Sequence, residues 1–184
     1  MSAPWLVVVD VQHVFADPGS PWGSPMMAGA LPQLHRLVAV FDGRTVATRF
    51  VAPQQPQGAW VPYYAEFTWA LQPPTAPLYA LVDGVVPPDA PVVTRTSFGK
   101  WDDAADGLAA LTAGADALVL AGVSTDCCVL STALAAADAG VAVQVVTDAC
   151  AGATQADHDR ALAAMALYAP LITLTTADAV LAAR

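Results

Sequence analysis

Charge is scarce in this sequence of 184 residues. Charged side chains make up 12% of it, about half the usual share for a soluble domain, and Lys100 is the only lysine. The balance of basic and acidic residues gives a formal net charge of −9. Because so negative a chain repels phosphate backbones, we expect no nucleic-acid partner.

Long apolar runs are also missing, although hydrophobic residues make up 56% of the chain. The uncharged stretch from Ala161 to Ala177 is interrupted by Pro170, whereas a membrane-spanning helix needs about 20 apolar residues. The opening MSAPWLVVVD lacks the basic start of a signal peptide and reaches Asp10 early. We therefore expect no membrane span and a cytoplasmic location.

Cysteine is rare as well, and its three residues are Cys127, Cys128 and Cys150. An odd number at this density does not resemble the disulfide framework of a secreted domain. The spacings that are typical of a structural zinc site, Cys-x-x-Cys or His-x-x-x-His, do not occur. We expect reduced thiols, no metal and no cofactor.

The sequence does contain short β-branched runs that alternate with Ala- and Leu-rich segments. The predicted strands are Leu6–Val9, Thr45–Thr48, Pro91–Thr94, Ala117–Ala121, Val141–Val146 and Leu171–Leu174. The predicted helices are Leu31–Phe41, Cys128–Ala139 and Gln155–Leu167. This alternation favours an α/β fold, a doubly wound and mainly parallel sheet with helices on both faces, in one domain over residues 1–184.

The segment from Ala52 to Pro91 differs, because it holds most of the prolines and many of the aromatic residues. Proline fixes the backbone without regular hydrogen bonding. The segment is therefore either a rigid wall of a small-molecule pocket or an excursion packed on the core or on another subunit. As candidates for a substrate-binding wall we select Phe15, Trp22, Trp60 and Tyr64.

Three reactive side chains follow predicted strands: Asp10, Lys100 and Cys128. In a doubly wound sheet, ligands bind beyond the carboxyl ends of the strands, so we expect these groups to meet. A carboxylate accepts a thiol proton, and a lysine and a helix N-terminus favour the thiolate. Singly, each has a structural interpretation, as a turn cap, a surface lysine or a core cysteine. Together they predict nucleophilic attack on a carbonyl.

Two motifs carry a family resemblance. The block GVSTDCCVLSTALAAADAG, Gly122 to Gly140, resembles the cysteine block of the isochorismatase-like cysteine hydrolases, and VVVDVQHVF resembles their opening strand end. The resemblance implies an Asp–Lys–Cys triad, here with Asp10 and the nucleophile Cys128. It also implies a cis peptide between Val123 and Ser124, an oxyanion hole of the Ser124 and Cys128 amides, and a homo-oligomer, either a dimer or a tetramer.

The sequence departs from this family at two places. By its spacing to Cys128, the family's lysine falls at Arg95, so either Arg95 replaces it or the lysine has moved to Lys100. We prefer Lys100, because an arginine does not readily exchange protons. The nicotinamidase branch binds a metal through an Asp-x-His motif and a further His, and the corresponding RFVAPQQPQGAW has neither residue type. We therefore do not expect a metal-dependent nicotinamidase.

The predicted function is cofactor-independent hydrolysis of a small amide or ureido C–N bond through a Cys128 thioester. Gln12 is expected to touch the small-molecule substrate or to hold Asp10. Two alternatives stay open. One is an isochorismatase-type vinyl ether hydrolase, which acts by protonation and does not need the cysteine. The other is an inactive binding or scaffold protein on the same fold.

Overall fold

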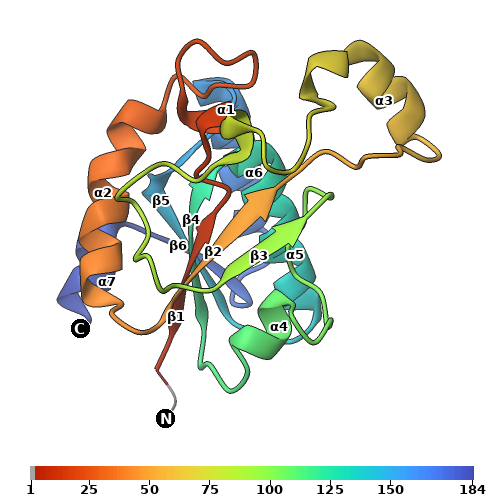
Figure 1. The fold of residues 1–184 in the computed structure, drawn as a ribbon. Coiled ribbons are helices and arrows are strands. Elements are labelled where there is room, and N and C mark those ends of the chain that lie inside the picture. The colour runs from red at the N-terminus through yellow and green to blue at the C-terminus, as the bar shows by residue number, and fades with distance from the viewer. Residues whose placement is uncertain (1–2) are drawn as a thin grey trace.

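The computed structural model describes residues 3–184, and its centre is a six-stranded sheet (Figure 1). The strands are β1 (Trp5–Val9), β2 (Thr45–Phe50), β3 (Val92–Arg95), β4 (Leu118–Val123), β5 (Val143–Ala151) and β6 (Ile172–Thr175). Neighbouring strands pair in parallel in the order β3-β2-β1-β4-β5-β6. The order reverses between β1 and β4, which confirms the doubly wound α/β fold.

Helices cover both faces of the sheet (Figure 1). They are α1 (His13–Ala16), α2 (Met27–Val40), α3 (Trp60–Glu66), α4 (Leu108–Leu111), α5 (Leu130–Asp138), α6 (Gln155–Ala166) and α7 (Ala177–Ala182). Helices α2 and α7 contact each other and β5 on one face, while α5 and α6 pack together with β6 on the other. Within residues 3–184, no helix is both long and apolar enough to cross a membrane.

Strand β1 divides its side chains between two hydrophobic cores. Leu6 and Val8 lie in the core that includes the buried side of α2, and Val7 and Val9 lie in the core that includes α5. All four side chains are fully buried. Each such burial contributes about 1.5–3 kcal/mol relative to exposure. A strand that is covered on both faces must be apolar throughout, which accounts for part of the hydrophobic surplus of the chain.

All six predicted strands exist, but some element boundaries differ. Helix α2 begins at Met27 and runs through Pro32, whereas the prediction placed that proline in the first turn. The helix predicted from Cys128 begins instead at Leu130. A π-helical turn, Thr125–Val129, precedes it and is closed by a hydrogen bond from Val129 N to Ser124 O of 3.0 Å.

Gly122 allows β4 to lie close to β1 beside the end that carries Asp10. Its φ is +131°, and an added Cβ would lie 2.1 Å from the carbonyl oxygen of Val9. We expect Gly122→Ala to lower the free energy of unfolding by about 3 kcal/mol, measured by urea denaturation. Gly29→Ala is the control: Gly29 is inside α2, and a Cβ added there would meet no atom outside the adjoining helix backbone within 4 Å, so a gain of up to about 1 kcal/mol is expected. Equal losses in both variants would contradict this account of Gly122.

Candidate active site

Asp10 is held in a fixed orientation directly after β1. Its φ of +49° lies in the left-handed region, which aspartate tolerates better than most residues, and its side chain is fully buried. The Asp10 amide donates to Thr48 Oγ1 at 3.2 Å, and the same hydroxyl donates to Asp10 Oδ1 at 2.6 Å. Thr48, in β2, thereby leaves Oδ2 as the oxygen directed to the next residue of the site.

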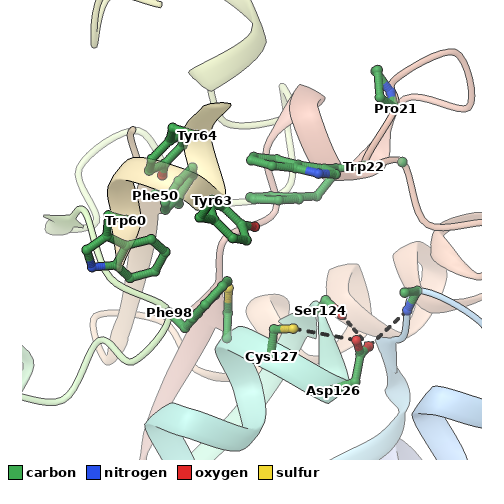
Figure 2. A pocket seen from close by; sticks show the side chains of 14 residues that line it. Pro21, Trp22, Phe50, Trp60, Tyr63, Tyr64, Phe98, Ser124, Asp126 and Cys127 are labelled. Carbon is green, nitrogen blue, oxygen red and sulfur yellow. Dashed lines mark hydrogen bonds between the residues drawn. The ribbon is translucent and has the colours of Figure 1, made fainter. Parts of the chain in front are cut away.

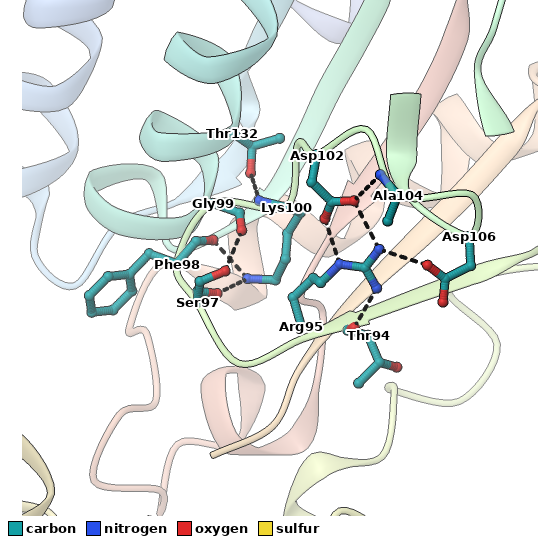
Figure 3. Close-up of polar contacts among 10 residues, drawn as sticks. All are labelled: Thr94, Arg95, Ser97, Phe98, Gly99, Lys100, Asp102, Ala104, Asp106 and Thr132. Carbon is teal, nitrogen blue, oxygen red and sulfur yellow. Dashed lines mark hydrogen bonds and ion pairs between the residues drawn. The ribbon is translucent and has the colours of Figure 1, made fainter. Parts of the chain in front are cut away.

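That residue is Lys100, whose Nζ lies 2.7 Å from Asp10 Oδ2, with both side chains fully buried. The ammonium also donates to the carbonyl oxygens of Ser97 at 2.8 Å and Phe98 at 2.7 Å (Figure 3). Two of the three N–H donors of the ammonium are used by these carbonyl oxygens, and the Asp10 carboxylate supplies the counter-charge. Because a buried charge is tolerated only when it is paired, this geometry explains how a fully buried lysine is stable.

Arg95 is directed to a different set of partners (Figure 3). Its guanidinium forms a bidentate pair with Asp102, with Nε to Oδ2 at 2.5 Å and Nη2 to Oδ1 at 3.0 Å, and Nη2 lies 3.1 Å from Asp106 Oδ1. The hydrogen bond from Arg95 lowers the pKa of Asp102. Arg95, at the end of β3, therefore binds two carboxylates of the loop that follows it. Lys100, on the same loop, is the basic residue that contacts Asp10.

Cys128 lies in the π-helical turn after β4 and is almost fully buried. Burial raises the pKa of its thiol well above the usual range, and the charge of Asp10 and a hydrogen bond to it raise it further. The Lys100 charge and the Ser124 backbone hydrogen bond act in the opposite direction but do not overcome burial. The resting thiol is therefore protonated at neutral pH, with Asp10 next to the proton.

Two polar contacts hold this turn in place. The hydroxyl of Thr132, in α5, donates to Cys128 O at 2.7 Å and accepts from the Lys100 amide at 3.0 Å. Thr125 Oγ1 lies 2.9 Å from Nδ1 of His158, which is buried beneath the turn. Burial lowers the pKa of His158, so its ring is neutral. The peptide bond between Val123 and Ser124, which leads into the turn, is cis.

A cavity of about 270 Å³ opens beside Cys128 (Figure 2). The four residues selected from the sequence, Phe15, Trp22, Trp60 and Tyr64, all line it. Trp60 and Tyr64 belong to α3, so the proline-rich segment does form part of the pocket wall.

Several lining residues were not selected from the sequence: Phe50, Tyr63, Phe98, Asp126 and Cys127. Tyr63 follows Trp60 by three positions and therefore shares its side of a helix, which is a signal that was present in the sequence. Asp126 and Cys127 lie inside the cysteine block itself. Phe98 and Phe50 have no comparable signal, because their place in the wall depends on how the loops fold over the sheet.

Gln12 was expected to touch the substrate or to hold Asp10, but it does not line the pocket and its side chain forms hydrogen bonds elsewhere. Its Nε2 donates to the carbonyl oxygens of Phe50 at 2.9 Å and Tyr79 at 2.7 Å. Its Oε1 accepts from the Phe50 amide at 2.8 Å. The fully buried amide thus joins the end of β2 to the proline-rich segment, and these contacts use both of its polar atoms.

The family model of the isochorismatase domain matches residues 4–178 of the chain. The chain belongs to the isochorismatase family. It is accordingly an isochorismatase-family hydrolase, and the cysteine block and the opening strand end both lie inside the matched range. The comparison with curated proteins finds no match.

Solved structures with this fold include three that are informative here. A cysteine hydrolase from Pseudomonas syringae pv. phaseolicola 1448A superposes with a TM-score of 0.84 at 17% identity, over 96% of this chain and 90% of that one. The pyrazinamidase of Pyrococcus horikoshii, in complex with zinc, gives 0.76 at 24% identity over 94% and 98%. The N-carbamoylsarcosine amidase of Thermoplasma acidophilum gives 0.76 at 19% identity over 96% and 97%. These likenesses establish the shared fold.

The zinc of the pyrazinamidase structure raises the question of a metal in this member of the family. Among residues 3–184, no group of three or more His, Cys, Asp or Glu side chains is placed to hold an ion. The stretch from Arg49 to Trp60, which includes the last two residues of β2, contains neither Asp nor His. The donor set does not fit such a metal, and the chemistry considered below uses the chain's own side chains.

Proposed function

We propose that this isochorismatase-family protein hydrolyses a small amide or ureido C–N bond through a thioester on Cys128. The observation that carries the proposal is the fully buried ion pair of 2.7 Å between Lys100 and Asp10, together with the almost fully buried Cys128 thiol, whose pKa is raised by burial and by the charge of Asp10. A base next to a nucleophile, with a third group that orients the base, is the arrangement that nucleophilic catalysis requires. Two solved neighbours named as amidases support the choice of bond.

In the first half-reaction, Asp10 accepts the Cys128 proton while the sulfur attacks the substrate carbonyl carbon. The raised pKa of the thiol means that little thiolate exists beforehand, so proton transfer and attack belong to the same step. The negative charge that develops on the carbonyl oxygen is held by backbone amides, for which Ser124 and Cys128 remain our candidates. The C–N bond then breaks, and the leaving nitrogen takes the proton from Asp10.

In the second half-reaction, a water molecule attacks the thioester and Asp10 accepts its proton. The C–S bond breaks, the sulfur regains a proton from Asp10, and the carboxylic acid product leaves. Lys100 stabilises the Asp10 carboxylate as its ion-pair partner in the steps in which that carboxylate is charged. Asp10 is therefore the group that carries the proton in both directions, and Lys100 sets its orientation.

The thioester can be trapped directly. During turnover of an amide substrate, hydroxylamine should intercept the acyl group as a hydroxamate, and acid quenching should leave the acyl mass on the peptide that contains Cys128. Mass spectrometry distinguishes this site from Cys127 by fragmentation. Release of ammonia with neither a hydroxamate nor an adduct at Cys128 would contradict the covalent mechanism.

A further inference from the structure

Within residues 3–184, the pocket that opens beside Cys128 is lined by a single charged side chain, and that side chain is acidic. Among the described residues that line it, Asp126 carries the only formal charge. Lys100 and Asp10 are fully buried outside the pocket lining and cancel each other as an ion pair, and the raised pKa of the Cys128 thiol keeps it protonated. The resting site therefore carries one net negative charge, and its walls offer no cation to pair with an anionic substrate.

The rings that line the pocket form one continuous aromatic wall (Figure 2), because Trp22 contacts Tyr63 with ring centroids 6.4 Å apart. At one end of this wall the rings of Trp60, Tyr63 and Phe98 are in mutual contact, with centroids 5.3, 5.4 and 6.2 Å apart. At the other end Trp22 stacks on Phe15 at 6.1 Å with 10° between the ring planes. The faces of aromatic rings carry partial negative charge and attract cations, most strongly for tryptophan.

Asp126 lines the same pocket and is held in place by hydrogen bonds. Its Oδ1 accepts hydrogen bonds from the Ser124 hydroxyl and from the Ala153 amide, the latter at 2.9 Å. Its Oδ2 has only the Cys127 thiol, at 3.6 Å and thus a weak donor (Figure 2). A carboxylate has about four acceptor sites, so Oδ2 retains capacity that faces the pocket. The carboxylate is oriented in advance without being neutralised by a cation.

We infer that the substrate of this site is an amide that carries, at the end away from the amide group, a cation with an apolar surface, such as a quaternary ammonium. The inference rests on the proposed function, because it assigns the substrate class to the same site. Aromatic faces and one unneutralised carboxylate attract such a cation, whereas a carboxylate substrate would lose its hydration without gaining a partner. The volume of about 270 Å³ lies just below the usual range of small-molecule sites, about 300–1,000 Å³, and limits the substrate to a small molecule.

The test uses three amides that share one chain and differ in their far end: trimethylammonio-butanamide, its tert-butyl isostere and the monoamide of glutaric acid. Their affinities are measured calorimetrically with Cys128→Ala, which binds without turnover. We expect the cation to bind about tenfold more tightly than its isostere, and the anion to bind more weakly than both. Equal affinities, a preference for the anion, or no binding at millimolar concentration would overturn the inference.

A pair of variants tests whether the preference for the cationic amide arises in the pocket. Asp126→Asn, combined with Cys128→Ala, should reduce the ratio of cation to isostere affinity about fivefold or more, because the net charge of the site is lost. Asp42→Asn removes the same charge from an exposed turn and should leave the ratio unchanged. If the two variants change the ratio equally, the preference is a property of the whole acidic protein and the inference is wrong.

The two proposals fail in different ways. If the affinities rank as expected but the wild type releases no ammonia from any of the three amides, the charge preference stands and the amide hydrolysis is wrong. If the neutral or the anionic amide is hydrolysed fastest and bound most tightly, the hydrolysis stands and the inferred substrate class is wrong. Measuring ammonia release and affinity on the same three compounds separates these results.

Discussion

Cys128→Ala is expected to lower kcat/KM for any amide that this protein hydrolyses by at least about a thousandfold, measured as ammonia release. Without the sulfur no thioester forms, and the remaining oxyanion contacts cannot replace the nucleophile. The loss should appear in kcat rather than in substrate affinity, because the pocket walls and Asp126 are untouched. This is the largest change in activity that we expect from a single substitution.

Cys150→Ala is the matched control for this variant. It removes a thiol that is also buried, in β5 and outside the pocket lining, so amide turnover should stay within a few fold of wild type. Full amide turnover in Cys128→Ala would show that the thioester mechanism is wrong. If that variant instead cleaved a vinyl ether, the isochorismatase-type alternative would be favoured.

The pH dependence of Cys128 alkylation gives a second measurement of the same thiol. An ordinary cysteine reaches its full reaction rate a little above its pKa of about 8.5. Burial and Asp10 raise the pKa of Cys128 well above the usual range, so the thiolate fraction is still increasing there. Iodoacetamide should therefore modify Cys128 at a rate that continues to rise beyond about pH 10, where an ordinary thiol has levelled off. A plateau below that pH would contradict the raised pKa of the Cys128 thiol.

The sequence was sufficient for the fold and for the positions of Asp10 and Cys128 beside the ends of strands, because both follow from strand patterns. A strand that is buried on both faces is apolar throughout, and the residue that follows it lies at the common edge of the sheet. Asp10 comes directly after such a strand, and Cys128 follows another after a short turn. No contact between distant loops had to be known for these assignments.

The remainder of the site depends on such contacts. The choice between Arg95 and Lys100 rests on where the loop after β3 folds back, and the Asp102 and Asp106 carboxylates that engage Arg95 come from that same loop.

Gln12 was misassigned because its partners, Phe50 and Tyr79, are far along the chain. No periodic pattern in the sequence indicates where α3 lies relative to the sheet, so the residues that its side chains contact across the pocket could not be predicted.

Lys100→Met is expected to lower the free energy of unfolding by about 3–5 kcal/mol, measured by urea denaturation at neutral pH. The substitution leaves the Asp10 carboxylate fully buried without its counter-charge, and it removes the donor from the carbonyl oxygens of Ser97 and Phe98. We also expect kcat/KM to fall at least about a hundredfold in whatever fraction remains folded, because Asp10 loses the paired side chain that orients it.

Arg95→Met separates this effect from the general loss of a cation on the same loop. The side chains of Arg95 and Asp102 are 20% and 32% exposed, so breaking their pair should cost about 1 kcal/mol or less. Adding Asp10→Asn to Lys100→Met should cost less than the sum of the two single substitutions, because the buried charge is then removed with its partner. If Arg95→Met lost as much activity as Lys100→Met, the assignment of the basic position to Lys100 would be wrong. A fully stable and active Lys100→Met protein would show that the buried ion pair does not support the site at all.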